Sequence, residues 1–210
     1  MSEVKAPRRR RATQTRSKAT VQKILDAATD LIVERGAQGV TMSEIAKRAD
    51  LVIGSLYQYF ADRSAICRAI LIRHQAEART LLHHHVAGVK SLEALTEALS
   101  LSFDAYFELL QRDRLIIGLW AIVQTDPELQ ALDLEDTLQN ARHLAGVAAP
   151  MLPGVETNRL VATFTMLIQF SLYAGRLARD VPGPIAQELP ATFKVMFLES
   201  MQSLQRASRT

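Results

Sequence analysis

The stretch TMSEIAKRADLVIGSLYQYF, residues 41–60, has the pattern of two short helices joined by a tight turn. In its second half Leu56 and Phe60 lie four residues apart and share one helix face, with Ile53 three residues before Leu56, and we expect all three to pack inward. The other faces carry uncharged polar side chains, namely Ser55, Tyr57, Gln58 and Tyr59. Such groups exchange hydrogen bonds with phosphates and base edges without placing a carboxylate against the DNA backbone. The stretch therefore predicts a helix-turn-helix that binds DNA.

The residues before this stretch complete a three-helix unit. Over about residues 19–35 one helix face is apolar, and Gly36 suits a left-handed cap at the helix end. Thr41 with Glu44 three residues later has the pattern of a capping box, which opens the second helix. Asp50 and Leu51 form the turn, and the third helix is expected over about 52–60. Small residues at the expected contacts suit a compact domain over 19–63.

Positive charge is concentrated in the first third of the chain. Residues 1–63 carry 12 Lys and Arg against 7 Asp and Glu, whereas residues 64–210 carry 13 against 15. This asymmetry predicts a polyanionic partner for the first third alone. We expect residues 1–18 to be a disordered basic arm that follows phosphates or enters a minor groove through Arg8, Arg9, Arg10 and Arg11. The alternative is a solubilising tail.

Composition favours an all-α protein of the cytoplasm. Hydrophobic residues make up 48% of the 210 residues, and 9 Gly and 7 Pro leave few turns. The single Cys67 excludes an intramolecular disulfide framework, and we expect it to be an inert packing residue. The N-terminus has no apolar run typical of a signal peptide. Residues 160–175 are the most apolar, but we expect a buried helix there, too short and too polar for a membrane span of about 20 residues.

The remaining chain predicts six further helices, about nine in all, in a regulatory and dimerisation domain over 64–210. They are expected over about 62–85, 91–112, 114–124, 126–145, 156–179 and 184–207. The last two are apolar on several faces, which favours a symmetric four-helix interface between two copies of the chain. The alternative is that these two helices only close the core of one chain.

The helices after residue 91 also carry the composition of an apolar pocket. Large apolar side chains accompany a few polar ones that would orient a small molecule. The candidate ligand-binding residues are Phe103, Tyr106, Phe107, Leu110, Trp120, Val123, Gln124, Arg142 and His143. The alternative, residue by residue, is ordinary core packing.

Nothing in the sequence predicts an enzyme. The chain lacks a Gly-rich phosphate loop and the HExxH, CxxC and GxSxG motifs. Three consecutive histidines, residues 83–85, lie about 100° apart around a helix and cannot converge on one ion. We expect no catalytic residue, no metal site and no cofactor.

The run ILDAATDLIVERGAQGVTMSEIAKRADLVIGSLYQYFADRSAI, residues 24–66, resembles the N-terminal domain of the TetR family of bacterial transcription regulators. The resemblance covers about a third of the chain and is carried by Gly36, Thr41, the Ile45-Ala46 pair, the GSLYQYF run, Arg63 and Ile66. Two positions depart from the family pattern. Asp50 stands where many members have Gly, and Val52 stands where many have Ser, which removes a possible helix cap and phosphate ligand.

The resemblance implies a role for each polar residue. Thr41 would present its hydroxyl and adjacent N–H groups to a phosphate, and Tyr57, Tyr59 and Arg63 would bind further phosphates. Ser55 and Gln58 remain as the candidates for reading base edges, since Gln pairs with adenine in bidentate fashion. The alternative for the two tyrosines is partial core packing.

Together these observations predict a homodimeric, sequence-specific transcription regulator that binds a near-palindromic operator on double-stranded DNA. We expect a repressor released by a small, largely apolar ligand, with dimerisation through the last two helices and no membrane partner. Two alternatives stay open, a dimeric DNA-binding protein without an effector and a helical carrier or enzyme for an apolar small molecule.

Overall fold

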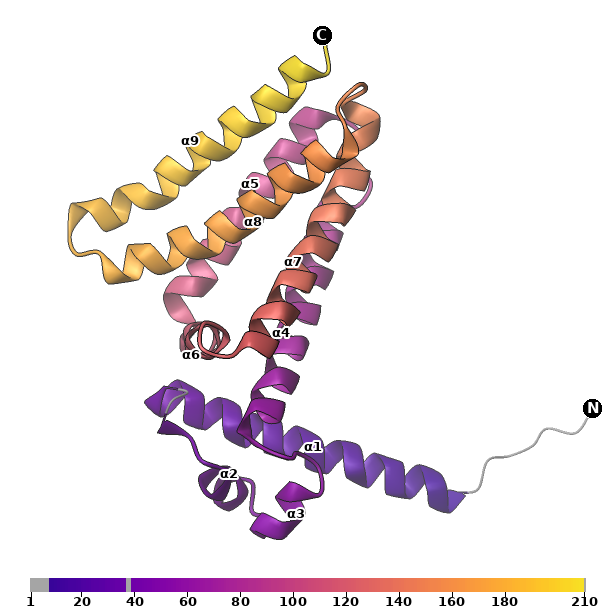
Figure 1. The fold of residues 1–210 in the computed structure, drawn as a ribbon, viewed down its shortest axis with the longest axis vertical. Helices are drawn as coiled ribbons and strands as arrows, with labels where there is room; N and C mark the ends of the chain where they lie inside the picture. Colours follow the sequence, from indigo (N-terminus) through magenta and orange to yellow (C-terminus); the bar gives the residue numbers. More distant parts are fainter. Residues whose placement is uncertain (1–7, 37–38, 210) are drawn as a thin grey trace, which may run out of the picture. The chain divides into compact units, whose positions relative to one another are not determined.

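The computed structural model describes residues 8–36 and 39–209, with side chains from Arg16 onward. This part of the chain contains nine α-helices and no strand, which confirms the all-α prediction (Figure 1). The helices are α1 (Arg8–Arg35), α2 (Met42–Arg48), α3 (Ile53–Tyr57), α4 (Arg63–Val86), α5 (Leu92–Arg112), α6 (Arg114–Val123), α7 (Pro127–Ala148), α8 (Thr157–Asp180) and α9 (Pro184–Ala207).

The chain divides into two compact units, one ending at Arg73 and the other beginning at His74. The division falls inside α4, ten residues after the boundary expected at 63/64. The first three turns of α4 belong with the head because Ile66 and Ile70 are buried there.

The first unit is a small helical head. Within it α2 packs against both α1 and α3 (Figure 1). Its core is built from fully buried aliphatic side chains, Ile24, Ile45, Leu56, Ile66 and Ile70. These are the apolar positions that the sequence spacing assigns to the inner helix faces.

Helix α1 begins at Arg8, eleven residues before the expected start at Ala19. The prediction of a disordered arm is therefore wrong for residues 8–18, whose backbone is helical. Arg, Ala, Gln and Lys have high helix propensity, and extending an existing helix costs far less than nucleating a new one. The side chains of Arg8, Arg9, Arg10 and Arg11 lie outside the described residues.

Helix α3 is shorter than expected and its start lacks a side-chain cap. It covers Ile53–Tyr57 rather than residues 52–60, and Val52 occupies the N-cap position without a side-chain hydrogen bond. Leu56 is buried as predicted, but Ile53 is 42% exposed, so the expectation that it packs inward is wrong. Ile53 is the first helical residue, where no neighbouring turn covers it.

The turn between α2 and α3 places Asp50 in the left-handed region, with φ of 54°. Only Gly adopts this conformation freely, and a β-branched residue is the least tolerant of it. This is the physical reason for Gly at this position in many members of the resembling family.

Replacing Asp50 with Val is therefore expected to destabilise the head, while Asp50→Gly is expected to be near neutral. The left-handed conformation costs a β-branched residue about 1–2 kcal/mol, and the exposed side chain makes no packing contact that compensates. Urea denaturation of both variants checks this prediction, with Asp50→Gly as the matched control. Equal stability of the two variants would contradict it.

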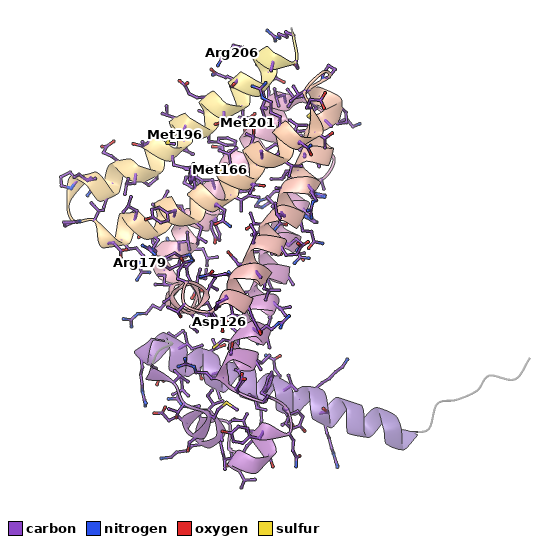
Figure 2. All side chains as sticks on the ribbon, in the orientation of Figure 1. Asp126, Met166, Arg179, Met196, Met201 and Arg206 are labelled. Carbon is purple, nitrogen blue, oxygen red and sulfur yellow. The ribbon has the colours of Figure 1, made fainter. Side chains whose placement is uncertain are left out.

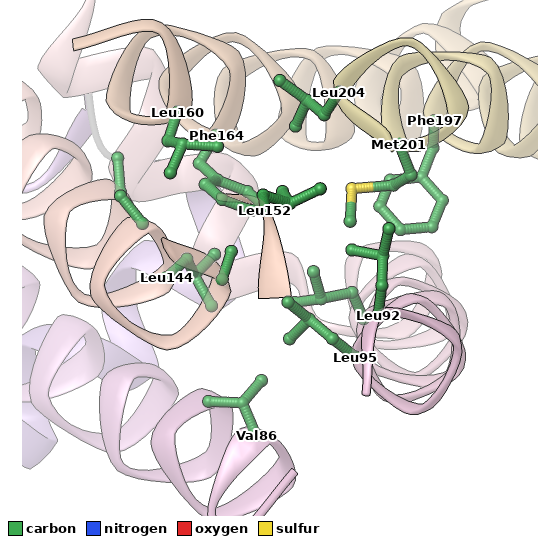
Figure 3. Close-up of a cluster of buried hydrophobic side chains, with 14 of the residues drawn as sticks. Val86, Leu92, Leu95, Leu144, Leu152, Leu160, Phe164, Phe197, Met201 and Leu204 are labelled. Atoms are coloured by element: carbon green, nitrogen blue, oxygen red, sulfur yellow. The ribbon is translucent and has the colours of Figure 1, made fainter. Parts of the chain in front are cut away.

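The second unit has its core between α5, α7, α8 and α9 (Figure 3). Phe164 and Leu160 of α8 and Phe197 and Met201 of α9 are buried in this cluster. Helix α5 approaches α8 closely at Gly175, where an added Cβ would lie 2.3 Å from Leu110 Cδ1. Helix α7 begins with Asp126, which accepts hydrogen bonds from the N–H groups of Glu128 and Leu129, followed by Pro127 in the first turn.

Helix α8 differs from the expectation for the apolar stretch 160–175. It has 24 residues, so by length and composition alone it could cross a membrane, and the prediction that the segment is too short is wrong. Only 17% of the residues in its most apolar stretch are fully buried within one chain. Most of the other residues of this stretch are half-buried, and the exposed large apolar side chains of α8 are Met166, Phe170 and Tyr173.

Candidate functional site

The outer face of α3 and the residues after it combine aromatic and amide side chains. Tyr57, Gln58 and Tyr59 are exposed, and Ser55 is half-buried. Leu56 anchors this segment, because its carbonyl accepts hydrogen bonds from the N–H groups of Tyr59 and Phe60. Gln58 is the C-cap residue of α3 rather than a mid-helix residue. The four polar residues predicted to contact DNA thus lie within five consecutive positions, held by one buried leucine.

Thr41 is the N-cap of α2, but its polar groups are already engaged. Its hydroxyl donates to Glu44 Oε2 at 2.8 Å, and its N–H donates to the same oxygen at 3.0 Å. The hydrogen bonds from Thr41, its hydroxyl foremost, lower the pKa of the Glu44 carboxyl, so this group is an anion at neutral pH. A phosphate at this helix end would have to displace a carboxylate. The arrangement confirms the capping box and does not favour the phosphate role of Thr41.

Several arginines of the head hold helices together. Arg48 of α2 forms two hydrogen bonds with Glu34 of α1, at 2.8 and 2.7 Å, and this contact lowers the pKa of the Glu34 carboxyl. Arg35 pairs with Glu44 at 2.8 Å. Arg63 donates from Nη1 to the carbonyl of Val40 at 3.4 Å, so it fastens the loop before α2 as well as being a candidate phosphate ligand.

Other cations of the head remain unpaired. Among the side chains that the structure describes, no carboxylate pairs with Arg16, Lys18 or Lys23 of α1, or with Lys47 of α2. All four are exposed. Lys47 was not among the DNA-contact residues predicted from the sequence, although its charge on the first helix of a helix-turn-helix was a usable signal. Unpaired cations on such a surface are suited to phosphate contacts.

The candidate ligand-binding residues do not form one group. Phe103 and Leu110 belong to the packed interior, since Phe103 stacks on Phe193 with ring centroids 4.2 Å apart and Leu110 fills the space beside Gly175. Phe107 packs against the hydrophobic core of the second unit, and its ring centroid lies 5.8 Å from that of Phe103. Tyr106 lies near two carboxylates of α7, and burial together with their charges raises its pKa above the ordinary value.

The polar candidates are similarly dispersed. Gln124 is exposed and caps α6, with its carbonyl accepting a hydrogen bond from Gln130. Arg142 is exposed and pairs with Glu135 at 3.5 Å. His143 stacks on His83 with ring centroids 3.7 Å apart. The side chains of Gln124 and Arg142 are thus exposed, whereas the His143 ring packs on a residue of α4.

The apolar candidates of α6 differ in their surroundings. Val123 is buried. Trp120 is half-buried, and the guanidinium of Arg176 lies 3.8 Å from its ring centroid. Trp120 thus faces a cation and has no open apolar space over this side of its ring.

Helices α8 and α9 expose large apolar side chains in the single chain. Met166 of α8 and Met196 of α9 are labelled in Figure 2, and both are exposed, whereas Met201 of α9 is buried. The exposed set on these two helices also includes Phe170, Tyr173, Ile185, Val195 and Leu198. This is more apolar surface than two neighbouring helices of a monomer normally leave to solvent.

Comparison with known proteins identifies the head. Residues 24–70 match the family model described as bacterial regulatory proteins, tetR family. The HTH-type transcriptional regulator UidR of Escherichia coli is 23% identical over 177 residues, 80% of this chain and 88% of UidR. The uncharacterized HTH-type transcriptional regulator YvdT of Bacillus subtilis is 31% identical over 102 residues, 47% of this chain and 49% of YvdT.

Solved structures share the fold of most of the chain. SmeT, the repressor of a multidrug efflux pump of Stenotrophomonas maltophilia, aligns with a TM-score of 0.67 at 20% identity, covering 86% of this chain and 89% of SmeT. The SmeT–triclosan complex aligns with a TM-score of 0.66 at 21% identity, covering 87% of this chain and 91% of the other.

Proposed function

The chain belongs to the TetR family of DNA-binding transcription regulators, and on this premise we propose that it is a homodimeric repressor that a small, largely apolar ligand releases from a near-palindromic operator. Each head would place α3 in the major groove, with half-sites about one helical turn apart or more. The observation that carries this proposal is the exposed, uncharged polar surface of residues 55–59, anchored by the buried Leu56.

We assign base reading to Gln58 and Ser55, and phosphate contacts to Tyr57, Tyr59, Arg63 and Lys47. Arg48 pairs with Glu34 and Asp30 of α1, and the exposed Arg16, Lys18, Lys23 and Lys47 are available to the DNA backbone. Arg8, Arg9, Arg10 and Arg11 would extend this contact along the DNA from the start of α1. Thr41 would contribute only where a phosphate displaces Glu44.

Dimerisation is assigned to α8 and α9, whose exposed apolar side chains would pack on the same helices of a second copy. Two-fold symmetry of the protein would match the near-palindrome of the operator.

A ligand in the helical unit would favour a dimer whose heads are wrongly spaced for the operator. Such an effect requires different affinities for the two states, and a coupling of about 1–3 kcal/mol is typical. The SmeT–triclosan complex supports a small-molecule effector by analogy of fold. A regulator without an effector remains the second candidate, whereas the regulators among its relatives argue against a carrier or an enzyme.

Gln58→Ala is expected to relax base preference at one position of each half-site by about 1–3 kcal/mol, because a bidentate amide contact is lost. Lys47→Ala is the matched control, since it removes an exposed side chain from the same motif. It is expected to weaken binding to all duplexes evenly and to reduce the slope of log K against log salt by about 1.

Fluorescence anisotropy with single-base variants of a selected operator checks both expectations. Unchanged affinity and unchanged base preference in Gln58→Ala would contradict the base-reading role of Gln58.

A further inference from the structure

Asp133 of α7 lies where polar side chains from other helices of the second unit meet. Gln75 of α4 donates from Nε2 to Asp133 Oδ1 at 3.2 Å. A hydrogen bond from the Gln169 side chain of α8 favours the charged form of Asp133. The same side chain donates from Nε2 to Thr137 Oγ1 of α7 at 2.8 Å. Tyr106 of α5 is near enough to feel the charge of Asp133. Amides of α4 and α8 thus act on one carboxylate of α7, and the Tyr106 phenol of α5 lies within range of its charge.

Two neighbouring carboxylates of α7 differ in how their charge is balanced. Asp136 forms an ion pair with Arg79 and accepts a hydrogen bond from Asn140 Nδ2 at 3.0 Å. In the described part of the chain Asp133 has no cation within salt-bridge distance, and its polar partners are neutral amides. A part-buried carboxylate without a counter-charge is costly, and an arriving cation relieves that cost.

The nearby histidines do not supply the missing charge. Burial lowers the pKa of His74, and burial together with the neighbouring His143 and Arg79 lowers the pKa of His83. Both imidazoles are therefore neutral at pH 7 and above. Burial also raises the pKa of the Asp133 carboxyl, although the amides of Gln75 and Gln169 act in the opposite direction. Burial thus disfavours the negative charge of Asp133, and no described cation neutralises it.

A second, independent observation is an unpaired acceptor on the same helix. Asn140 is only 7% exposed, and its Oδ1 has no hydrogen-bond partner. Its orientation is set by the bond from Nδ2 to Asp136, so the free atom is the carbonyl oxygen. Asp133, Thr137 and Asn140 follow the i, i+4, i+7 spacing of one helix face. The unpaired buried donor nearby, Arg79 Nε, belongs to a guanidinium that Asp136 already neutralises.

We propose that Asp133 binds the protonated amine of an amphipathic organic cation, whose apolar part lies against α5. An ammonium group would supply the positive charge that the Asp133 carboxylate lacks, since the hydrogen-bond partners of this carboxylate are neutral amides, and Asn140 Oδ1 on the same helix face is an acceptor without a partner. This inference rests on the proposed ligand-responsive function and narrows its effector from a largely apolar molecule to an apolar amine.

Three probes with the same alkyl chain and different head groups test the proposal on the full chain. Decylammonium, 1-decanol and decanoate are titrated by isothermal calorimetry at pH 7, below their aggregation concentrations. Wild-type protein is expected to bind decylammonium at least about tenfold more tightly than 1-decanol, which corresponds to about 1.4 kcal/mol, with decanoate the weakest. Equal affinities for the charged amine and the neutral alcohol would overturn the proposal without any variant.

Asp133→Asn removes the charge and keeps the shape and an acceptor oxygen. The variant is expected to lose the preference for decylammonium and to retain the affinity for 1-decanol. The matched control is Glu135→Gln, which removes one carboxylate from the exposed side of the same helix and is expected to leave the preference unchanged. A preference that survives in Asp133→Asn, or that disappears equally in Glu135→Gln, contradicts the role of Asp133.

Operator binding, measured in parallel, separates this inference from the function it rests on. If the chain binds its selected operator and shows no preference for the amine, the proposed cation site alone is wrong. If no duplex is bound in a sequence-specific way, the proposed function fails, whatever the probes show.

Discussion

Phe170→Glu on α8 is expected to convert the dimer into monomers and to lower operator affinity at least about 100-fold. Phe170 is 43% exposed in the single chain and lies among the exposed apolar side chains of α8 and α9. In a two-fold interface the substitution buries two carboxylates without partners, at several kcal/mol each. A monomer would contact only one half-site and would lose the affinity that the second head contributes.

Analytical ultracentrifugation and fluorescence anisotropy measure the two effects. The matched control is Leu101→Glu, which introduces the same charge at an exposed apolar position of α5. This control is expected to remain a dimer and to bind DNA normally. A dimeric Phe170→Glu with unchanged operator affinity would contradict the assignment of the interface to α8 and α9.

Phe164→Ala is expected to destabilise the second unit by about 3–5 kcal/mol. Phe164 is 1% exposed and packs inside the cluster formed by α5, α7, α8 and α9 (Figure 3). Removing a buried aromatic ring loses its transfer free energy and leaves a cavity. The expected loss is a large part of the 5–15 kcal/mol that stabilises a typical protein.

Urea denaturation at one fixed protomer concentration measures this loss, because the proposed dimerisation would make stability depend on concentration. Leu101→Ala, at an exposed position, is expected to change stability by less than about 0.5 kcal/mol. A loss below about 1 kcal/mol for Phe164→Ala would show that the cluster is not the core of the unit.

The helical architecture was predictable because local chemistry marks most helix ends. Thr41 with Glu44 marks the start of α2, and Asp126 with Pro127 marks the start of α7. Both signals act within four residues, so they are readable without the tertiary structure. The inner faces of α1 and α2 were predictable for a similar reason, since apolar spacing determines which side packs.

The features that were not predictable depend on partners distant in the sequence or on the length of a helix. The early start of α1 at Arg8 was not predicted, because the basic residues before Ala19 were interpreted as an arm and not as an extension of the helix. Ile53 was expected to pack inward from its spacing to Leu56, but as the first residue of a short helix it has no neighbour to cover it. The Thr41 hydroxyl is hydrogen-bonded to Glu44 in the first turn of its own helix, so it is not free to bind a phosphate.

The candidate cation site could not be predicted from the sequence. Asp133 and Asp136 are ordinary acidic residues of an amphipathic helix, and such residues usually face solvent. Only the fold brings Gln75 to Asp133 and Arg79 to Asp136, since the members of each pair are 57 or more residues apart in the sequence. Which carboxylate lacks a counter-charge is therefore decided by packing.

Selection of binding sites from a random duplex library by the wild-type full chain tests the central claim most directly. The account predicts enrichment of one near-palindromic sequence, bound at physiological salt at least about 1,000-fold more tightly than a scrambled duplex. A library without an enriched sequence, or equal affinity for the selected and the scrambled duplex, would contradict it.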